Sequence, residues 1–132
     1  MLNMKQSKVI TAVPAWVPTA ESHRDSACVV GEWELVNIEL DGQESQFLFG
    51  TVISDYKGRW GAGDYVFTSM IMEMDLHNGL VKTRNSSYCL LGDGLEVFPT
   101  LEEAAKMKMT GQPLATIRDI EAKGFKIMTD DL

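Results

Sequence analysis

The dipeptide Asn78-Gly79 is the feature of this sequence that most restricts its fold. A two-residue β-turn needs positive φ angles at both central positions, and Asn followed by Gly adopts them readily. The turn is flanked by stretches with strand-like alternation of apolar and polar residues, 64–77 and 80–91. The sequence therefore predicts an antiparallel hairpin near the centre of the chain.

A two-residue turn also fixes which residues face each other across the hairpin. It places Asp75 opposite Lys82 and Glu73 opposite Arg84, so that two opposite-charge pairs lie on one face. The other face is predicted to be buried. Its apolar side chains are Val66, Met70, Met72, Met74, Leu76, Val81, Cys89 and Leu91.

Two further strands are predicted before this hairpin. Residues 29–40 are rich in β-branched and aromatic side chains and end at the turn Asp41-Gly42. Residues 46–55 form the next predicted strand, in which Gly50 indicates a bulge or a sharp bend.

Helices are predicted on both sides of the sheet region. Thr19 can cap a short helix that runs to about Ala27. Thr100 and Glu103 have the spacing of a capping box, which predicts the start of a second helix. The other predicted elements are short: a strand over 95–98, a helix over 113–122 that ends at Gly124, and a strand over 125–128.

These elements predict an α+β fold in a single domain of 132 residues. We expect a bent antiparallel sheet of about five strands, of which an SH3-like partial barrel is one form, with flanking short helices. Residues 1–18 would be an extended N-terminal arm, 28–98 the β core and 100–123 the C-terminal helices. An apolar content of 45% is sufficient for a core without metals or disulfides.

The charge of the chain is concentrated in the predicted sheet. The formal net charge is −7, and residues 28–99 alone hold four basic and eleven acidic side chains, which also gives −7. Such a field repels phosphate backbones and favours basic partners. No apolar run reaches the roughly 20 residues of a membrane span, and Pro14 interrupts the N-terminal apolar stretch too early for a secretory signal. We therefore expect a cytoplasmic protein without membrane contact.

The residue types that bind metals and cofactors show no ligand spacing. Cys28 and Cys89 are isolated and are predicted to be buried thiols, although a disulfide between them is possible in principle. The series Met70-x-Met72-x-Met74 resembles a thioether site for Cu(I), but its strand period favours a core face. The glycine-rich stretch 58–63 precedes a strand, whereas phosphate-binding loops precede a helix, so we interpret it as a mobile connection. We expect no metal and no cofactor.

Two sets of residues are candidates for function. Asp55, Asp64 and His77 could serve an enzyme, although carboxylates at strand ends more often make turns. Positive charge and aromatic rings on a β module are typical of single-strand binding. The binding candidates are Arg59, Trp60, Asp64, Glu73, Asp75 and Tyr88.

Residues 58–69, GRWGAGDYVFTS, and 83–92, TRNSSYCLLG, carry a family resemblance. Together they resemble a family of small uncharacterised bacterial and prophage proteins, a domain of unknown function. The resemblance implies a bacterial or phage setting, and it implies no activity and no catalytic residue.

Three functions follow as hypotheses. The first is a non-catalytic interaction protein whose acidic sheet binds a basic partner, for instance a nucleic-acid-binding host defence protein that it inhibits. The second is a β module for a small ligand or a single-stranded nucleic acid, although the net charge makes direct nucleic-acid binding the weaker choice. The third is an enzyme of unidentified type; we expect no enzyme.

Overall fold

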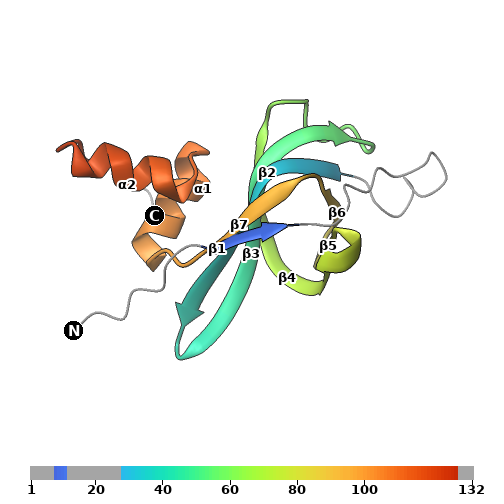
Figure 1. Cartoon of the computed structure of the whole chain (residues 1–132), viewed down its shortest axis with the longest axis horizontal. Coiled ribbons are helices and arrows are strands. Elements are labelled where there is room, and N and C mark those ends of the chain that lie inside the picture. The colour runs from blue at the N-terminus through green and yellow to red at the C-terminus, as the bar shows by residue number, and fades with distance from the viewer. Residues whose placement is uncertain (1–7, 12–27, 128–132) are drawn as a thin grey trace.

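The computed structural model of the protein describes residues 8–11 and 28–127 (Figure 1). The strands are β1 (Lys8–Thr11), β2 (Cys28–Leu40), β3 (Gln43–Asp55), β4 (Tyr65–Asp75), β5 (Leu80–Thr83), β6 (Ser87–Leu90) and β7 (Asp93–Val97). The helices are α1 (Leu101–Thr110) and α2 (Leu114–Ala122), and a 3-10 turn, η2, spans Leu76–Asn78. The predicted α+β class is confirmed.

The strands form one mixed sheet in the order β1-β7-β2-β3-β4-β5-β6, with an additional pairing between β2 and β6. Residues 28–30 of β2 pair in parallel with 88–90 of β6, and residues 34–36 pair in parallel with 95–97 of β7. The β2–β6 pairing joins the ends of the run β2 to β6 into a closed ring. The prediction of a purely antiparallel sheet of about five strands is therefore wrong, because β2 has parallel neighbours. The SH3-like form stays a prediction.

β2 is buried on both faces over most of its length. Residues 33–38 are all buried, which fits a strand that is covered on both sides. One apolar cluster lies inside the ring and includes Trp33, Leu35 and Leu48. A second cluster joins Val36 to Met107 of α1 and other residues of both helices, which lie together beside one end of the sheet (Figure 1).

Among the described residues Trp33 is the largest fully buried side chain, and the backbone closes tightly around it. Its indole Nε1 donates to the carbonyl oxygen of Gly92 at 3.0 Å. A Cβ on Gly94 would lie 2.2 Å from the indole ring, so the ring packs directly on the backbone of β7. The β2–β3 ladder has a bulge opposite Gly50, but its extra residue lies on β2 rather than on the strand for which the bulge was predicted.

The turn of the central hairpin differs from the predicted one. Leu76–Asn78 form η2, and Gly79 adopts the left-handed conformation with φ 67°. The Asp75 carboxylate accepts hydrogen bonds from the Asn78 backbone N–H at 3.3 Å and from its Nδ2 at 2.8 Å. The connection is therefore four residues long, because the Asp75 side chain stabilises an extra turn before the glycine.

This longer connection shifts the register of the hairpin. Glu73 lies opposite Lys82, and Asp75 lies opposite Leu80. The predicted pairs Asp75–Lys82 and Glu73–Arg84 are therefore wrong. The returning segment is also two strands rather than one, because the chain reverses between β5 and β6, where the Thr83 N–H donates to the Ser86 carbonyl at 2.9 Å.

The methionines of β4 are exposed, which corrects the prediction of a methionine core face. Met70, Met72 and Met74 are 40%, 57% and 38% exposed, whereas Val66 and Val81 of the same predicted face are buried. β4 shifts register against β3 between Phe67 and Met70, and against β5 between residues 71 and 73. Each bulge changes which side chains face the core, so simple alternation fails along this strand.

The C-terminal helices begin as predicted. Thr100 and Glu103 form the capping box, with the Thr100 N–H donating to Oε1 of Glu103 at 2.9 Å. The backbone N–H of Leu114, at the start of α2, donates to Oε1 of the buried Glu34 at 3.5 Å, and burial raises the pKa of this carboxyl. Residues 125–127 form no strand.

The N-terminal predictions fall mostly outside the described residues. Of the predicted arm, residues 8–11 form β1, which pairs antiparallel with β7. The helix predicted from Thr19 to Ala27 and residue Met128 lie outside the described ranges. Neither helix of the described chain has the length and apolarity that a bilayer crossing requires.

We predict that Gly94→Ala destabilises the fold by about 2 kcal/mol or more, because the added methyl group would overpack the core against the Trp33 ring. Urea unfolding followed by fluorescence measures this loss. Gly61→Ala is the matched control, since its Cβ would meet nothing closer than Asp64 Oδ2 at 3.7 Å. Equal stability of the two variants would contradict the packing of Trp33 on β7.

Candidate functional site

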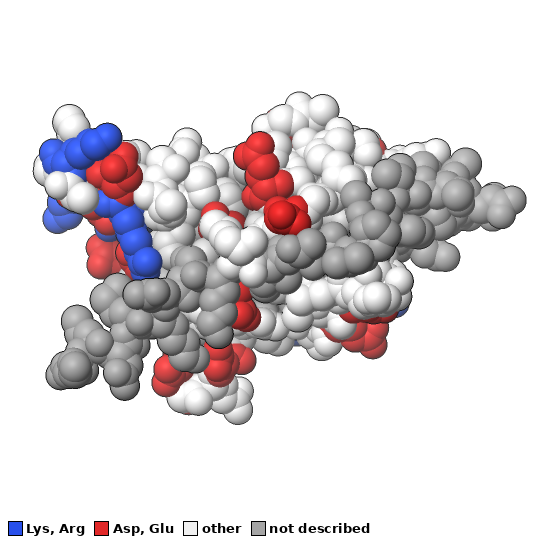
Figure 2. All heavy atoms as spheres, in the orientation of Figure 1, with Lys and Arg blue, Asp and Glu red and all other residues white. Residues whose placement is uncertain are grey.

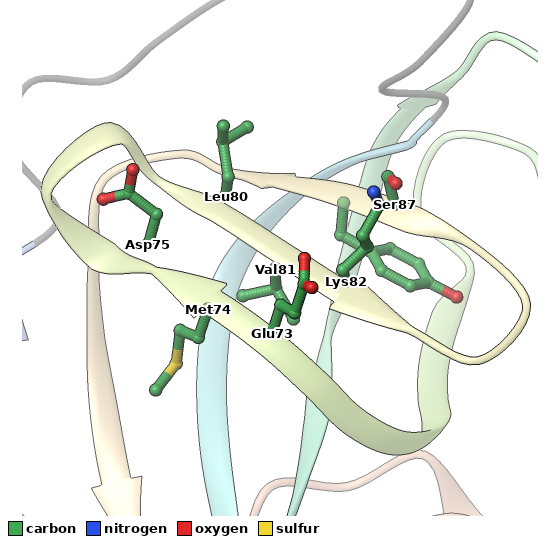
Figure 3. A pocket seen from close by; sticks show the side chains of 8 residues that line it. Glu73, Met74, Asp75, Leu80, Val81, Lys82 and Ser87 are labelled. Atoms are coloured by element: carbon green, nitrogen blue, oxygen red, sulfur yellow. The ribbon is translucent and has the colours of Figure 1, made fainter.

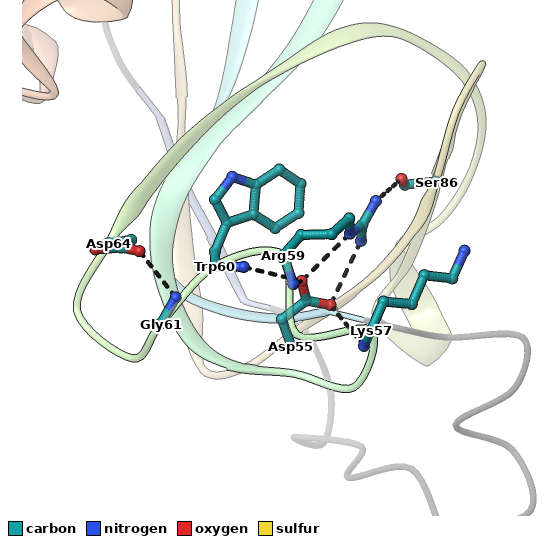
Figure 4. A network of polar contacts seen from close by, with 7 residues as sticks. All are labelled: Asp55, Lys57, Arg59, Trp60, Gly61, Asp64 and Ser86. Carbon is teal, nitrogen blue, oxygen red and sulfur yellow. Dashed lines mark hydrogen bonds and ion pairs between the residues drawn. The ribbon is translucent and has the colours of Figure 1, made fainter.

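The loop between β3 and β4 is organised by the carboxylate of Asp55. This side chain has no exposed surface. It accepts hydrogen bonds from the backbone N–H groups of Lys57 at 3.2 Å, Arg59 at 2.8 Å and Trp60 at 3.2 Å (Figure 4). These bonds fix the glycine-rich stretch, which the sequence indicated as a mobile connection.

Arg59 ties this loop to the turn between β5 and β6. Its Nε donates to Oδ2 of Asp55 at 3.2 Å, and its Nη1 donates to the hydroxyl of Ser86 (Figure 4). Its guanidinium carbon lies 4.3 Å from the centroid of the Trp60 ring, within cation–π range. The side chain of Arg59 remains 30% exposed, so the guanidinium is held in place while still reaching solvent.

The ionisation states at this place are set by burial and by Arg59. Burial alone would raise the pKa of Asp55, but the hydrogen bonds from Arg59 and the backbone amides outweigh it and lower this pKa. Burial raises the pKa of Tyr88. Burial, followed by the charge of Asp55, raises the pKa of Cys28 to about 12. Asp55 is therefore charged at neutral pH, and Cys28 is a neutral thiol rather than a nucleophile.

A cavity of about 450 Å³ lies beside this network. The rings of Trp60 and Tyr88 lie 6.5 Å apart with a tilt of 31° and form part of its wall. Arg59 also lines the cavity, so the structure brings together three of the predicted binding residues. Further lining comes from β4, from the β5–β6 turn and from Lys108 of α1.

The other predicted binding residues lie elsewhere. Glu73 and Asp75 line a second cavity of about 340 Å³, which Tyr88 also lines (Figure 3). A third cavity, of about 400 Å³, is lined by Glu44, Glu96 and their neighbours, and Asp64 lines none of the three. Its carboxylate accepts from the Gly61 N–H at 2.8 Å and shapes the loop before β4.

The residues considered for catalysis do not share a cavity. None of Asp55, Asp64 and His77 lines the three cavities described here. Asp55 is ion-paired, and His77 lies in the exposed turn η2. Within the described ranges no three His, Cys, Asp or Glu side chains are grouped so as to hold a metal. Cys28 and Cys89 are both buried, and they form no disulfide with each other.

Sequence reasoning missed two contributors to the larger cavity. Ser86, which anchors Arg59, is buried at 9% exposure although it lies in a polar turn sequence. Lys108 belongs to α1 and lines the cavity because α1 packs against β4, where the Tyr65 hydroxyl donates to the carbonyl of Lys108, 43 positions further along the chain, at 2.8 Å. No local pattern in the sequence signals either contact.

The fold and cavity define a small α+β protein built on a closed ring of strands. The chain belongs to a family described as a domain of unknown function, DUF6957, whose sequence profile matches residues 2–106. The expected membership of an uncharacterised family is thereby confirmed. No curated protein and no solved structure matches the chain. The matched residues include the whole ring and the Arg59 loop, and they end within α1.

We predict that Asp55→Asn destabilises the protein at pH 7 by about 1–2 kcal/mol, because it weakens the charged hydrogen bonds that hold the loop. The loss stays modest because Arg59 is part-exposed and solvent screens its charge. The pKa of Asp55 is lowered in the folded state, so its charge stabilises the fold above its unfolded pKa of about 3.9. This contribution is lost as the pH falls further through the folded pKa.

The difference in unfolding free energy between wild type and Asp55→Asn should therefore shrink below about pH 4. Urea titrations across a pH series measure it. Asp64→Asn is the control, since its carboxylate accepts one backbone hydrogen bond, which an amide oxygen can keep. An Asp55→Asn deficit that is the same at both ends of the pH series would rule out the charged network.

Proposed function

We propose that this protein is a non-catalytic interaction protein whose acidic sheet binds a basic protein partner. The proposal rests on the charge of residues 28–99, which equals the −7 of the whole chain. Net charge of one sign on a folded surface steers partners of the opposite sign and sets the rate of encounter.

The distribution of ion pairs supports this choice of surface. In the helices, Lys106 bonds Glu121 at 2.6 Å and Arg118 bonds Glu103 at 2.9 Å, so the charges largely cancel. In the loop between β3 and β4, Arg59 pairs with Asp55 at 3.2 Å. Figure 2 agrees: Lys and Arg gather at the helical end, and separate groups of Asp and Glu lie over the rest of this face.

The end of β4 is the part of the sheet best suited to a basic segment. Glu73 and Asp75 are exposed there, and Asn78 hydrogen bonds lower the pKa of Asp75, which keeps it charged. Met74, between these two carboxylates, is 38% exposed, and Met72, directly before Glu73, is 57% exposed. Exposed methionine beside carboxylates can adapt to the apolar and basic side chains of an amphipathic partner. The cavity that Glu73, Met74 and Asp75 line offers space for one such side chain (Figure 3).

The setting and the partner belong to the same proposal. The resemblance of residues 58–69 and 83–92 to bacterial and prophage proteins motivates a bacterial or phage origin and a cytoplasmic location. A nucleic-acid-binding host defence protein has a basic surface that normally contacts phosphate groups. An acidic sheet, SH3-like or otherwise, could bind that surface in place of the nucleic acid and so inhibit the partner.

We predict that the wild-type chain captures a basic protein from bacterial lysate. The purified pair should bind more weakly as the salt concentration rises from about 0.05 M to about 0.5 M, because salt screens the attraction between surface charges. Glu39, near the end of β2, and Glu73 are both exposed. The double variant Glu39→Gln/Glu73→Gln should weaken this binding by about threefold or more, mainly through slower association. Surface plasmon resonance with the purified partner measures both effects.

The matched control is Glu102→Gln/Asp119→Asn, which removes two charges from the helices instead of the sheet. It should change binding by less than the sheet variant. A captured partner that is acidic, an affinity that does not respond to salt, or equal loss in both variants would each count against the acidic sheet as the binding surface.

A further inference from the structure

The larger cavity lies where the wall of the ring is open. Residues 65–70 of β4 pair with β3, but β5 joins β4 only from Ile71 onward. Along 65–70 no other strand of the described chain pairs with this edge. The β5–β6 turn with Ser86 lies across from it, and Lys108 of α1 completes the lining. The opening is therefore part of how the ring is built, and residues of the β3–β4 loop, β4, the β5–β6 turn, β6 and α1 border it.

The charge of this cavity differs from that of the rest of the sheet. Arg59 and Lys108 line it, and among the described residues no carboxylate does. The two other cavities described here are lined by Glu73 with Asp75 and by Glu44 with Glu96, respectively. Asp55 balances the charge of Arg59, so Lys108 supplies the net positive charge of the cavity. This charge favours an anion at short range, because charges beyond about 8 Å are screened at physiological salt.

The guanidinium of Arg59 is held in place and keeps donors free. Of the five N–H donors of an arginine, Asp55 accepts from Nε and from Nη2, and Ser86 accepts from Nη1. Two N–H bonds remain, on a side chain that is 30% exposed. Among the described residues no ion pair involves Lys108. Both cations are thus available to an anionic group, and one of them is already oriented.

The other side chains that line the cavity determine the size and polarity of the ligand that fits. Trp60, Val66 and Tyr88 give apolar walls, and Ser69 and Asn85 add polar side chains. A volume of about 450 Å³ lies in the range of small-molecule sites. One face of Trp60 is covered by the Arg59 guanidinium, which removes it as a stacking platform for a nucleic-acid base.

We propose that this cavity is a binding site for a small organic anion, a carboxylate or phosphate on a flat apolar body, with Arg59 and Lys108 as its charged contacts. The site is separate from the acidic surface at the end of β4. Of the two ligands considered for a β module, this proposal favours the small ligand over a single-stranded nucleic acid. A long polyanion would also be repelled by the net charge of −7 on residues 28–99.

The test titrates the ¹⁵N-labelled full chain with three probes in separate NMR experiments. Benzoate supplies a carboxylate, phenyl phosphate a phosphate, and benzamide the same ring without charge. We expect saturable shifts of the Ser69, Asn85 and Ser86 amides with benzoate or phenyl phosphate. Benzamide should bind about tenfold more weakly, since it lacks the charge. The two anions distinguish a carboxylate ligand from a phosphate ligand.

Lys108→Gln tests the charged contact without touching the Asp55 network. It should weaken binding of the preferred anion by about fivefold, while the Tyr65 contact survives because it uses the Lys108 backbone carbonyl. Lys126→Gln makes the same change of charge outside the cavity and should leave binding unchanged. The proposal would be overturned if no shifts appeared at about 10 mM probe or if benzamide bound as tightly as the anions. It would also be overturned if Lys108→Gln had no effect or if a single-stranded oligonucleotide bound more tightly than the small anions.

Discussion

Strand β2 pairs with β3 along its length and with two different parallel strands on its other edge. Residues 28–30 pair with β6, and residues 34–36 pair with β7. The bulge between these two segments lets the strand turn from one partner to the other around the buried Trp33. Ring closure, the position of β7 and the docking of the helices behind β2 all depend on this arrangement.

Local signals predicted the local structure well. The strand over residues 29–40, the turn at Asp41-Gly42 and the capping box at Thr100 are each confirmed. In each case the deciding interactions lie within a few residues, so the sequence pattern contains them. The parallel neighbours of β2 could not be predicted in this way, because the partners lie about 60 positions away along the chain.

The central hairpin shows how one wrong assumption propagates. Asn78-Gly79 does form a turn, but Asp75 caps an additional 3-10 turn and changes the register. Two bulges in β4 then leave Met72 and its neighbours exposed. For the cavity, composition was enough to select Arg59, Trp60 and Tyr88. Ser86 and Lys108 could not be selected, because their roles exist only after distant elements have packed.

The shared pairing of β2 also determines the order in which the chain can fold. Trp33 is covered only when Gly92 and Gly94 arrive, and Gly92 follows it by 59 positions. The β3 and β4 strands can assemble on β2 earlier, since they follow it directly. A nascent chain that has not yet exposed β6 and β7 therefore carries an open ring with an unpaired strand edge. Because long-range pairings slow folding in general, we expect closure of the ring to be the late step.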